Sequence, residues 1–325
     1  MKIAFLTEMD FTGSISADHP NMRTEFAWMH ALQADHIPIK QYDKIRGYDR
    51  IMIILPKGRV ILSADGAEVD NQSNTTAALL KAPLVSTLKQ HNGKVYYVQE
   101  GPHWWFNDYA LSDQINFYNM LADCDAIFAH NQSDTNYYRG LFPNKQVGVI
   151  PTLLIEDLIQ HIKPNPQPQV IIGGNMARWY GGFESMIVAR GFGLSISVQT
   201  SHASKSGECQ LINCLPRMSW FEWMKQLSTF KYAVHLMPTV AAGTFALNCA
   251  YFGIPCIGNQ LVDTQQVCFP LTSVAIHDID RARQLVQRLH SDSEFYQQVS
   301  QQAKHNYNTH FSKHQFLQKM QPQLA

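Results

Sequence analysis

The sequence predicts an α/β protein made of two doubly wound parallel-sheet domains, and three observations indicate this fold class. Short apolar runs alternate with helical patterns along the chain, as expected for strands covered by helices. At 325 residues, the chain is long for one hydrophobic core, so two domains of about 150 residues are expected. The alternation is interrupted at Ile162-Lys-Pro-Asn-Pro-Gln-Pro-Gln169, whose alternating prolines predict a stiff, extended linker that cannot join a central sheet.

The first predicted domain covers residues 1–160. Its apolar runs predict strands at 3–7, 50–55, 94–98, 126–130 and 146–150. Helical periodicity falls between them, at about 21–33, 75–90, 108–122 and 133–140. A loop with Thr12-Gly13-Ser14 follows the first strand, so its polar residues are expected at the carboxyl edge of the sheet, where open α/β sheets bind ligands.

The second predicted domain covers residues 169–308, where the same alternation restarts. Strands are expected at 170–172, 194–198, 232–236 and 254–257. Helices are expected at 182–190, 219–230, 244–252, 280–290 and 293–306. A last amphipathic segment at 311–319 lies within a C-terminal stretch, 309–325, that we expect to join the first domain.

Composition excludes several classes of protein. An apolar content of 45% with 11% aromatic residues indicates a globular chain, and 26 acidic against 26 basic residues leave no net charge to recruit nucleic acid or membrane. The six cysteines form no C-x-x-C pair, which favours reduced thiols. With no signal peptide and no apolar run long enough to span a membrane, we expect a cytoplasmic protein, in the host cytoplasm if a phage encodes it.

Two glycine-bearing turns, each between an apolar run and a helix, are the most informative feature. The first runs from Gln169 through Gly173 and Gly174 to Arg178, and the second contains Gly243-Thr-Phe-Ala-Leu-Asn248. Glycine lets backbone amides approach an anion closely, and a helix N-terminus offers unpaired N–H groups and partial positive charge. We therefore predict that these turns bind a diphosphate, with Arg178 adding a charge-assisted contact.

These turns and the order of the elements resemble GT-B glycosyltransferases. A sharper similarity is to the DNA β-glucosyltransferases of T-even phages, in Met1-Lys-Ile-Ala4, Tyr48-Asp-Arg-Ile-Met-Ile-Ile54, Lys94-Val-Tyr-Tyr-Val98 and Glu184-Ser-Met-Ile187. The resemblance implies two Rossmann-like domains facing a central cleft and a nucleotide diphosphate-sugar as co-substrate, with UDP as the expected nucleotide. It also implies that Gly13, Gly173, Gly174, Gly243 and Thr244 help to bind the donor, and that Arg217 lies in the loop that meets the base.

Retaining GT-B enzymes often carry a Glu-x7-Glu motif in the second turn, and this chain departs from it. The match of Gly253-Ile-Pro-Cys-Ile257 to the following piece places Asn248 and Val240 where the two glutamates would stand. Without these carboxylates, the resemblance favours inversion. Asn248 still offers an amide donor and acceptor for a ribose hydroxyl.

Inverting transfer needs a base for the acceptor proton. Glu100 ends an apolar strand just before Gly101-Pro102, and the phage enzymes carry their catalytic Asp at nearly the same place. Asp10 and Asp18, in the loop after the first strand, are alternatives. A surface carboxylate at a strand end is the non-catalytic interpretation of Glu100.

For the acceptor, the resemblance points to a 5-hydroxymethylpyrimidine in double-stranded phage DNA. The run His103-Trp-Trp-Phe106 is suited either to core packing or to stacking on a sugar or an extruded base. Residues 40–59 hold six basic residues against two Asp, which is either a DNA-binding patch or a solvated face. The neutral net charge keeps a glycan, lipid or protein acceptor open.

The sequence is compatible with two further functions and carries little sign of a metal site. A nucleotide-sugar epimerase shares the architecture, and a non-catalytic sugar-nucleotide binding protein is a third alternative. We predict no metal ligand set, because His310 and His314, spaced i, i+4 on an expected helix, lack a third ligand nearby. Whether a divalent cation assists the leaving diphosphate stays open.

Overall fold

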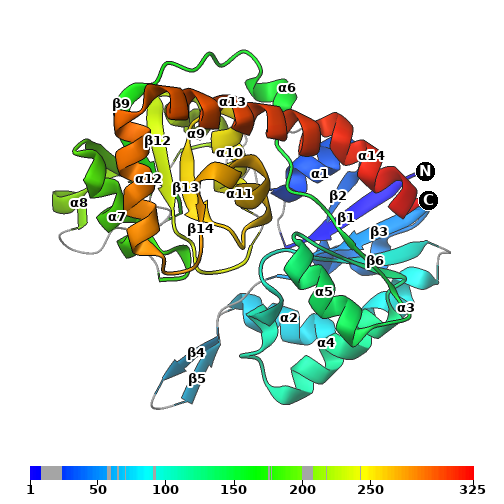
Figure 1. Cartoon of the computed structure of the whole chain (residues 1–325). Coiled ribbons are helices and arrows are strands. Elements are labelled where there is room, and N and C mark those ends of the chain that lie inside the picture. Colours follow the sequence, from blue (N-terminus) through cyan, green and yellow to red (C-terminus); the bar gives the residue numbers. More distant parts are fainter. Residues whose placement is uncertain are drawn as a thin grey trace. The chain divides into compact units, whose positions relative to one another are not determined.

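The computed structural model describes residues 1–8, 24–56, 60–63, 66–69, 71–90, 93–174, 176, 178–199, 208–216, 218–241 and 243–325. These residues divide into two compact units. Unit 1 comprises 1–8, 28–150 and 320–325, and unit 2 comprises 24–27 and 151–319. Each unit has its own hydrophobic core and its own six-stranded sheet (Figure 1).

The sheet of unit 1 is parallel throughout, with strand order β2-β1-β3-β6-β7-β8. Its strands are β1 (Ile3–Thr7), β2 (Asp35–Pro38), β3 (Arg50–Ile53), β6 (Lys94–Gln99), β7 (Ala126–Ala129) and β8 (Gln146–Val149). The central strands are in register, since Ile51 of β3 pairs with Ala4 on one side and with Val95 on the other. All carboxyl ends therefore lie at one edge of this sheet.

Both faces of this sheet are buried, as parallel sheets require. Residues two apart on a strand, such as Val95 and Tyr97, belong to the main core of unit 1. Tyr96 and Phe128 are buried on the opposite face, where their rings meet edge to face with centroids 5.8 Å apart. The helices of this unit are α1 (Thr24–Leu32, from residue 28), α2 (Asn71–Lys81), α3 (Leu84–Lys89), α4 (Leu111–Asp123) and α5 (Gln132–Leu141).

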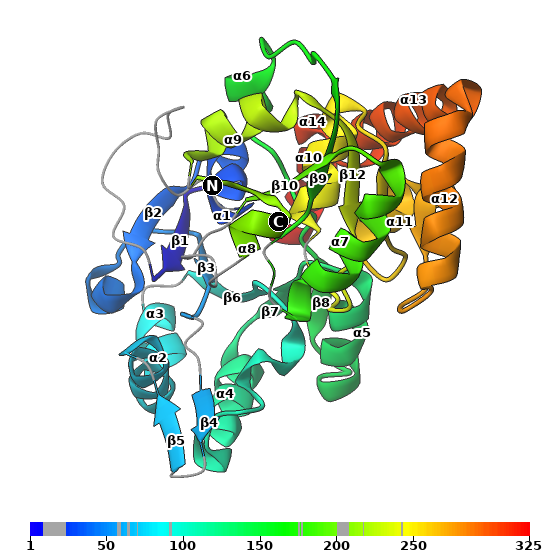
Figure 2. The same cartoon turned by 90° about the vertical axis from the view of Figure 1, so that its left-hand side faces the viewer.

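Two features of unit 1 differ from the expected elements. The single helix expected at 75–90 is two helices, α2 and α3, because Pro83 lacks a backbone N–H and comes between them. An antiparallel hairpin of β4 (Val60–Ser63) and β5 (Gly66–Val69) precedes α2 and is separate from the main sheet (Figure 2).

The last helix, α14 (Lys313–Leu324), begins in unit 2 and ends in unit 1. Within unit 1 its end is held by side chains from two strand starts. Arg50 Nε donates to the carbonyl of Leu324 at 2.6 Å, and Gln146 Nε2 donates to that of Gln323 at 3.0 Å.

Unit 2 repeats the architecture, with parallel strand order β11-β10-β9-β12-β13-β14. Its strands are β9 (Gln167–Ile172), β10 (Ser195–Gln199), β11 (Asn213–Leu215), β12 (Phe230–His235), β13 (Cys256–Asn259) and β14 (Ser273–Val274). Helices α7 and α12 cover one face, and α9, α10, α11 and α13 the other (Figure 1). The helices of the unit are α6 (Glu156–Ile159), α7 (Gly182–Ala189), α8 (Glu208–Leu211), α9 (Trp220–Leu227), α10 (Thr244–Phe252), α11 (Asp263–Cys268), α12 (Ile279–Ser291) and α13 (Ser293–His310).

The proline-rich segment 162–169 was expected to stay out of the sheet, and this prediction was wrong for its last three residues. The central strand β9 already begins at Gln167, whose N–H donates to the carbonyl of Thr229 at 2.7 Å. The pairing with β12 shifts register between Phe230 and Tyr232. This irregularity lets the chain pass Pro168, which cannot donate to a ladder.

Candidate functional site

The strand order of unit 2 reverses between β9 and β12. From β9 the chain moves outward to β10 and β11, and then returns to place β12, β13 and β14 on the other side. In open α/β sheets, ligands bind at the carboxyl end of this switch point. The first predicted glycine turn begins directly after β9, and the second lies in the connection from β12 to α10.

Side-chain packing brings the two turns together. Gly173 N–H donates to the carbonyl of Val234 at 3.0 Å, which extends the pairing of β9 and β12 by one residue. A Cβ atom on Gly173 would lie 2.5 Å from Cγ of His235 and 2.6 Å from Cδ1 of Phe245 in α10. Gly173 therefore packs directly against the helix that the second turn opens.

Gly174 and Gly243 adopt left-handed backbone conformations, with φ of 72° and 69°. A Cβ on Gly174 would lie 2.7 Å from the ring of Tyr180, and one on Gly243 would lie 2.0 Å from Oγ1 of Thr264. Both positions thus require glycine for reasons within the protein, whatever they bind. Gly243 is the N-cap of α10, so the first amides of that helix lie at this edge of the sheet.

Two further residues of α10, Thr244 and Asn248, were predicted to bind the nucleotide-sugar donor. Thr244 begins the helix, and its Oγ1 lies 3.3 Å from Oγ1 of Thr24. Asn248 is buried, and in the orientation that satisfies its amide it donates to the carbonyl of Thr244 at 3.2 Å and accepts from Trp223 Nε1 at 3.3 Å. Its amide is thus used within the unit, and a ribose contact stays a prediction.

Arg178 begins the short 3-10 helix η3 (Arg178–Tyr180) between the first turn and α7. Its backbone therefore follows Gly174 on the chain segment that leads away from the switch point. Its side chain lies outside the described structure, as do all atoms of Asp10, Gly13, Asp18 and Arg217.

His235 ends β12 at the switch point and was expected to be a core histidine. It is buried, its ring meets Phe245 edge to face at 5.1 Å, and its Nε2 has no hydrogen-bond partner among the described residues. Burial lowers the pKa of His235 to about 4, because the charged form loses its hydration. The imidazole is therefore neutral at physiological pH.

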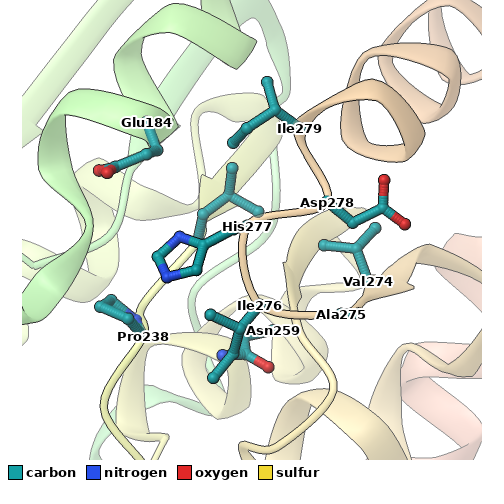
Figure 3. A pocket seen from close by; sticks show the side chains of 10 residues that line it. Glu184, Pro238, Asn259, Val274, Ala275, Ile276, His277, Asp278 and Ile279 are labelled. Carbon is teal, nitrogen blue, oxygen red and sulfur yellow. The ribbon is translucent and has the colours of Figure 1, made fainter.

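A hollow lies at the carboxyl ends of β12, β13 and β14, on the α7 side of unit 2. Its polar lining includes Glu184 of α7, the buried amide of Asn259, and His277 and Asp278 from the loop before α12. His277 has a left-handed backbone with φ of 63°, which is uncommon for a residue with a side chain. Figure 3 shows its ring turned toward the α7 side, whereas the Asp278 carboxylate points the other way.

In unit 1, Glu100 directly follows β6 at the carboxyl edge of the sheet and is half-buried. Its loop is fixed by the buried side chain of Gln99. Gln99 Nε2 faces the carbonyls of Glu100, Gly101 and Pro102 at 3.3–3.4 Å. Its Oε1 accepts from the hydroxyls of Tyr97 and Tyr138 at 2.6 and 2.8 Å.

His103 of the same loop pairs with Asp134 of helix α5. His103 Nδ1 and Asp134 Oδ1 are 2.7 Å apart, and the carboxylate of Asp134 is 1% exposed. Asn131 caps α5 by accepting from the N–H of Asp134, and its Nδ2 donates to Asp134 Oδ2 at 2.9 Å. The end of β7 and the start of α5 thus orient the imidazole through a buried carboxylate.

The sequence interpretation missed several of these residues. Gln99 was detectable as a polar side chain at the end of an apolar strand, and Asn131 with Asp134 as a helix N-cap pattern. Nothing in the sequence marks His277, because its backbone conformation depends on the packing of the loop before α12.

The other polar features of the sequence are also placed by the structure. His310 and His314 do not share a helix, because α13 ends at His310 and α14 begins at Lys313, which corrects the expected pairing. In the basic stretch, Arg46 and Arg50 donate to backbone carbonyls of unit 1. Five of the cysteines are free thiols, and four of these are buried (Cys124, Cys249, Cys256 and Cys268).

The described residues contain neither a candidate metal site nor a candidate membrane span. No cluster of three or more His, Cys, Asp or Glu side chains there is arranged to hold a metal ion. None of the helices in the described ranges combines the length and the apolar character that crossing a bilayer requires.

Comparison with known proteins gives structural but not sequence relatives. Neither a protein-family model nor a curated protein matches the chain. Anabaena HepE in complex with UDP-glucose has a TM-score of 0.66 at 10% identity, covering 100% of this chain and 99% of that one. Sucrose-phosphate synthase from Thermosynechococcus elongatus has a TM-score of 0.63 at 11% identity, covering 99% and 98%.

A third similar structure is an alpha-glucosyltransferase in complex with UDP and a 13-mer DNA that contains a HMU base. Its TM-score is 0.59 at 12% identity, covering 99% of this chain and 90% of that one. Identities of this size establish the fold and no more. With two Rossmann-like units, each a six-stranded parallel sheet, the chain has the GT-B fold that its sequence predicted.

Proposed function

We propose that the protein is a glycosyltransferase that moves a sugar from a nucleotide diphosphate-sugar, with UDP as the nucleotide, to an acceptor hydroxyl. The observation that carries the proposal is the meeting of the two glycine turns at the switch point of unit 2. The GT-B fold supports it, because structures with this fold are described with UDP or UDP-glucose bound. We place the enzyme in the cytoplasm, in line with its free thiols.

In this proposal, unit 2 binds the donor. The amides at the start of α10, next to Gly243 and Thr244, offer hydrogen bonds and partial positive charge to the diphosphate. Arg178 is assigned to the diphosphate, and Arg217 to the loop that meets the nucleotide base. Gly13 is also assigned to donor binding. A divalent cation is not required by this assignment.

Glu100 of unit 1 is the proposed base, with Asp10 and Asp18 as alternatives. The carboxylate stands at the end of a central strand, on a loop that Gln99 holds by its carbonyls. Taking the acceptor proton would let the hydroxyl attack the anomeric carbon as the diphosphate leaves, which inverts the configuration.

Retention is the second candidate mechanism, because one protein of this fold is described as an alpha-glucosyltransferase with UDP bound. The two mechanisms differ in the anomer that they form from the same donor. Proton NMR of the product, recorded as it forms, therefore decides between them.

A thermal-shift screen of UDP, ADP, GDP and their glucose conjugates tests donor binding. A nucleotide at 100 times its dissociation constant stabilises the folded protein by about 2.7 kcal/mol. We expect UDP and UDP-glucose to raise the melting temperature and the other nucleotides to do so less. No shift with any diphosphate would contradict the proposal.

The variant Glu100→Gln tests the base. We expect turnover to fall by about 100-fold or more while UDP affinity measured by calorimetry stays the same, because only the proton acceptor is removed. Glu294→Gln, an exposed carboxylate in the first turn of α13, is the matched control. If Glu100→Gln retains full turnover, the base lies elsewhere.

The same assay separates the alternative functions. An epimerase would convert the donor sugar without any acceptor, and a non-catalytic binding protein would bind UDP-sugar without turnover. For the acceptor, a hydroxymethylated base in duplex DNA is one candidate, since the alpha-glucosyltransferase of this fold is described with such a DNA. A glycan, lipid or protein hydroxyl is the other.

A further inference from the structure

Exposed aromatic rings lie on the loop that follows Glu100 and on the neighbouring helix α5. Trp104 and Tyr137 are each 39% exposed. The ring of His103 stacks on that of Tyr137, with centroids 4.1 Å apart and planes 28° apart. Trp104 in turn stacks on Trp105, which packs against the core of unit 1.

These rings are held in place rather than loosely attached. The pair of His103 with the buried carboxylate of Asp134 fixes the imidazole, and Asn131 fixes Asp134. Nδ1 of His103 is engaged by the carboxylate of Asp134, so Nε2 is the ring nitrogen that can hydrogen-bond a ligand. The stacked rings of His103 and Tyr137 therefore form a pre-formed flat surface with one polar edge in unit 1, and Trp104 is the next residue after His103 in the chain.

The segment that carries these rings is acidic in sequence. Residues 95–138 contain no lysine or arginine and six carboxylates, namely Glu100, Asp108, Asp113, Asp123, Asp125 and Asp134. Asp113 and Asp125 pair with Lys81 and Lys89 of the neighbouring helices, and these two pairs leave no excess of positive charge beside the segment. A nucleic acid backbone is bound mainly through basic side chains that replace its counterions. Such a segment disfavours a polyanion and accepts a neutral ligand.

We propose that the surface formed by His103, Trp104 and Tyr137 binds a neutral saccharide, and that this saccharide is the acceptor. The apolar face of a pyranose ring stacks on the exposed aromatic rings, and one hydroxyl hydrogen-bonds with Nε2 of His103. This inference rests on the proposed glycosyltransferase function and names its acceptor class.

The first experiment measures saccharide binding directly, without donor. Saturation-transfer NMR is recorded with neutral gluco-, galacto- and manno-oligosaccharides on the wild type and on Trp104→Ala and Tyr137→Ala. We expect at least one oligosaccharide to bind the wild type, and each alanine variant to bind it roughly 10-fold more weakly. Trp104→Phe, which keeps a ring, should restore most of the binding.

Tyr118→Ala is the matched control, since Tyr118 is also exposed in unit 1 and stacks on Phe142, but lies on α4. It should bind the oligosaccharide as the wild type does. Equal binding by the wild type and both alanine variants, or no binding of any neutral oligosaccharide, would overturn the inference.

The second experiment separates this inference from the proposed function. UDP binding by calorimetry should be unchanged in Trp104→Ala and Tyr137→Ala, while the acceptor KM rises. Turnover of a hydroxymethylated DNA duplex in place of the saccharides would overturn the acceptor class and leave the glycosyltransferase function standing. If the wild type does not bind UDP, the proposed function is refuted. The NMR result would still decide whether the surface binds a saccharide.

Discussion

Replacing Gly243 by alanine tests whether the second glycine turn is shaped by close packing. Gly243 has φ of 69°, and a Cβ there would lie 2.0 Å from Oγ1 of Thr264 and 2.5 Å from Cγ1 of Val262. Gly193 has nearly the same backbone, with φ of 64°, but a Cβ there would meet no atom within 4 Å. The two alanine variants therefore share the backbone cost and differ in steric overlap.

The expected costs follow from these contacts. The left-handed conformation costs alanine about 1–2 kcal/mol at either position. At Gly243 the overlap adds about 1–3 kcal/mol. Displacing Thr264 also weakens its 2.8 Å hydrogen bond to the carbonyl of Gly243, which adds about 1 kcal/mol. Gly243→Ala should thus be about 2–4 kcal/mol less stable than Gly193→Ala.

Differential scanning calorimetry measures this difference, and hydrogen exchange of residues 244–252 locates it. For a unit of this size, the unfolding transition of Gly243→Ala should lie roughly 5–15 °C below that of Gly193→Ala. Exchange in α10 should be faster in Gly243→Ala alone. Equal transitions in the two variants would refute the packing argument.

Three further changes have expected outcomes. Gln99→Leu leaves two buried tyrosine hydroxyls without their acceptor and releases the Glu100 loop. The free energy of unfolding in urea should therefore fall by about 2–4 kcal/mol, and turnover should fall as well. Unchanged stability would contradict this. The pKa of His235 is lowered to about 4, so the unfolded chain takes up a proton below pH 6.5 while the folded chain does not. The free energy of unfolding should therefore fall by up to about 3 kcal/mol as pH decreases from 6.5 to 4. Urea titrations of His235→Leu over this range should show a correspondingly smaller decrease. An equal decrease in His235→Leu would mean that another group causes the pH dependence. Tyr307→Phe removes the 2.6 Å hydrogen bond to Glu156, and calorimetry should show a loss of about 1–3 kcal/mol, with no loss if the bond does not contribute.

Most of the fold could be predicted from the sequence, because long apolar strands and amphipathic helices have distinct periods. The strands at 3–7 and 94–98 and the helix at 244–252 lie within a residue of their predicted bounds. The missed strands are short or polar at their ends, such as β2 (Asp35–Pro38) and β14 (Ser273–Val274). Such strands are specified by pairing with a neighbour rather than by their own pattern.

The candidate site was predictable only in part. The two glycine turns were recognisable because each stands between an apolar run and a helical pattern, and the structure shows in addition that Gly174 and Gly243 have left-handed backbones. The contact of Gly173 with His235 and Phe245 was not, because it joins residues far apart in sequence. The pair of His103 with Asp134 is missed for the same reason, since it depends on β6 and β7 being adjacent in the sheet.

Hydrogen–deuterium exchange with and without UDP tests the central claim most directly, that a nucleoside diphosphate binds at the switch point of unit 2. Saturating UDP should slow exchange in the amides of residues 171–174 and 243–248, on the two glycine turns. Segments of unit 1 to which this account assigns no ligand, such as 111–123 of α4, should exchange as before. Protection confined to unit 1, or no protection at these turns under conditions where UDP is bound, would contradict the account.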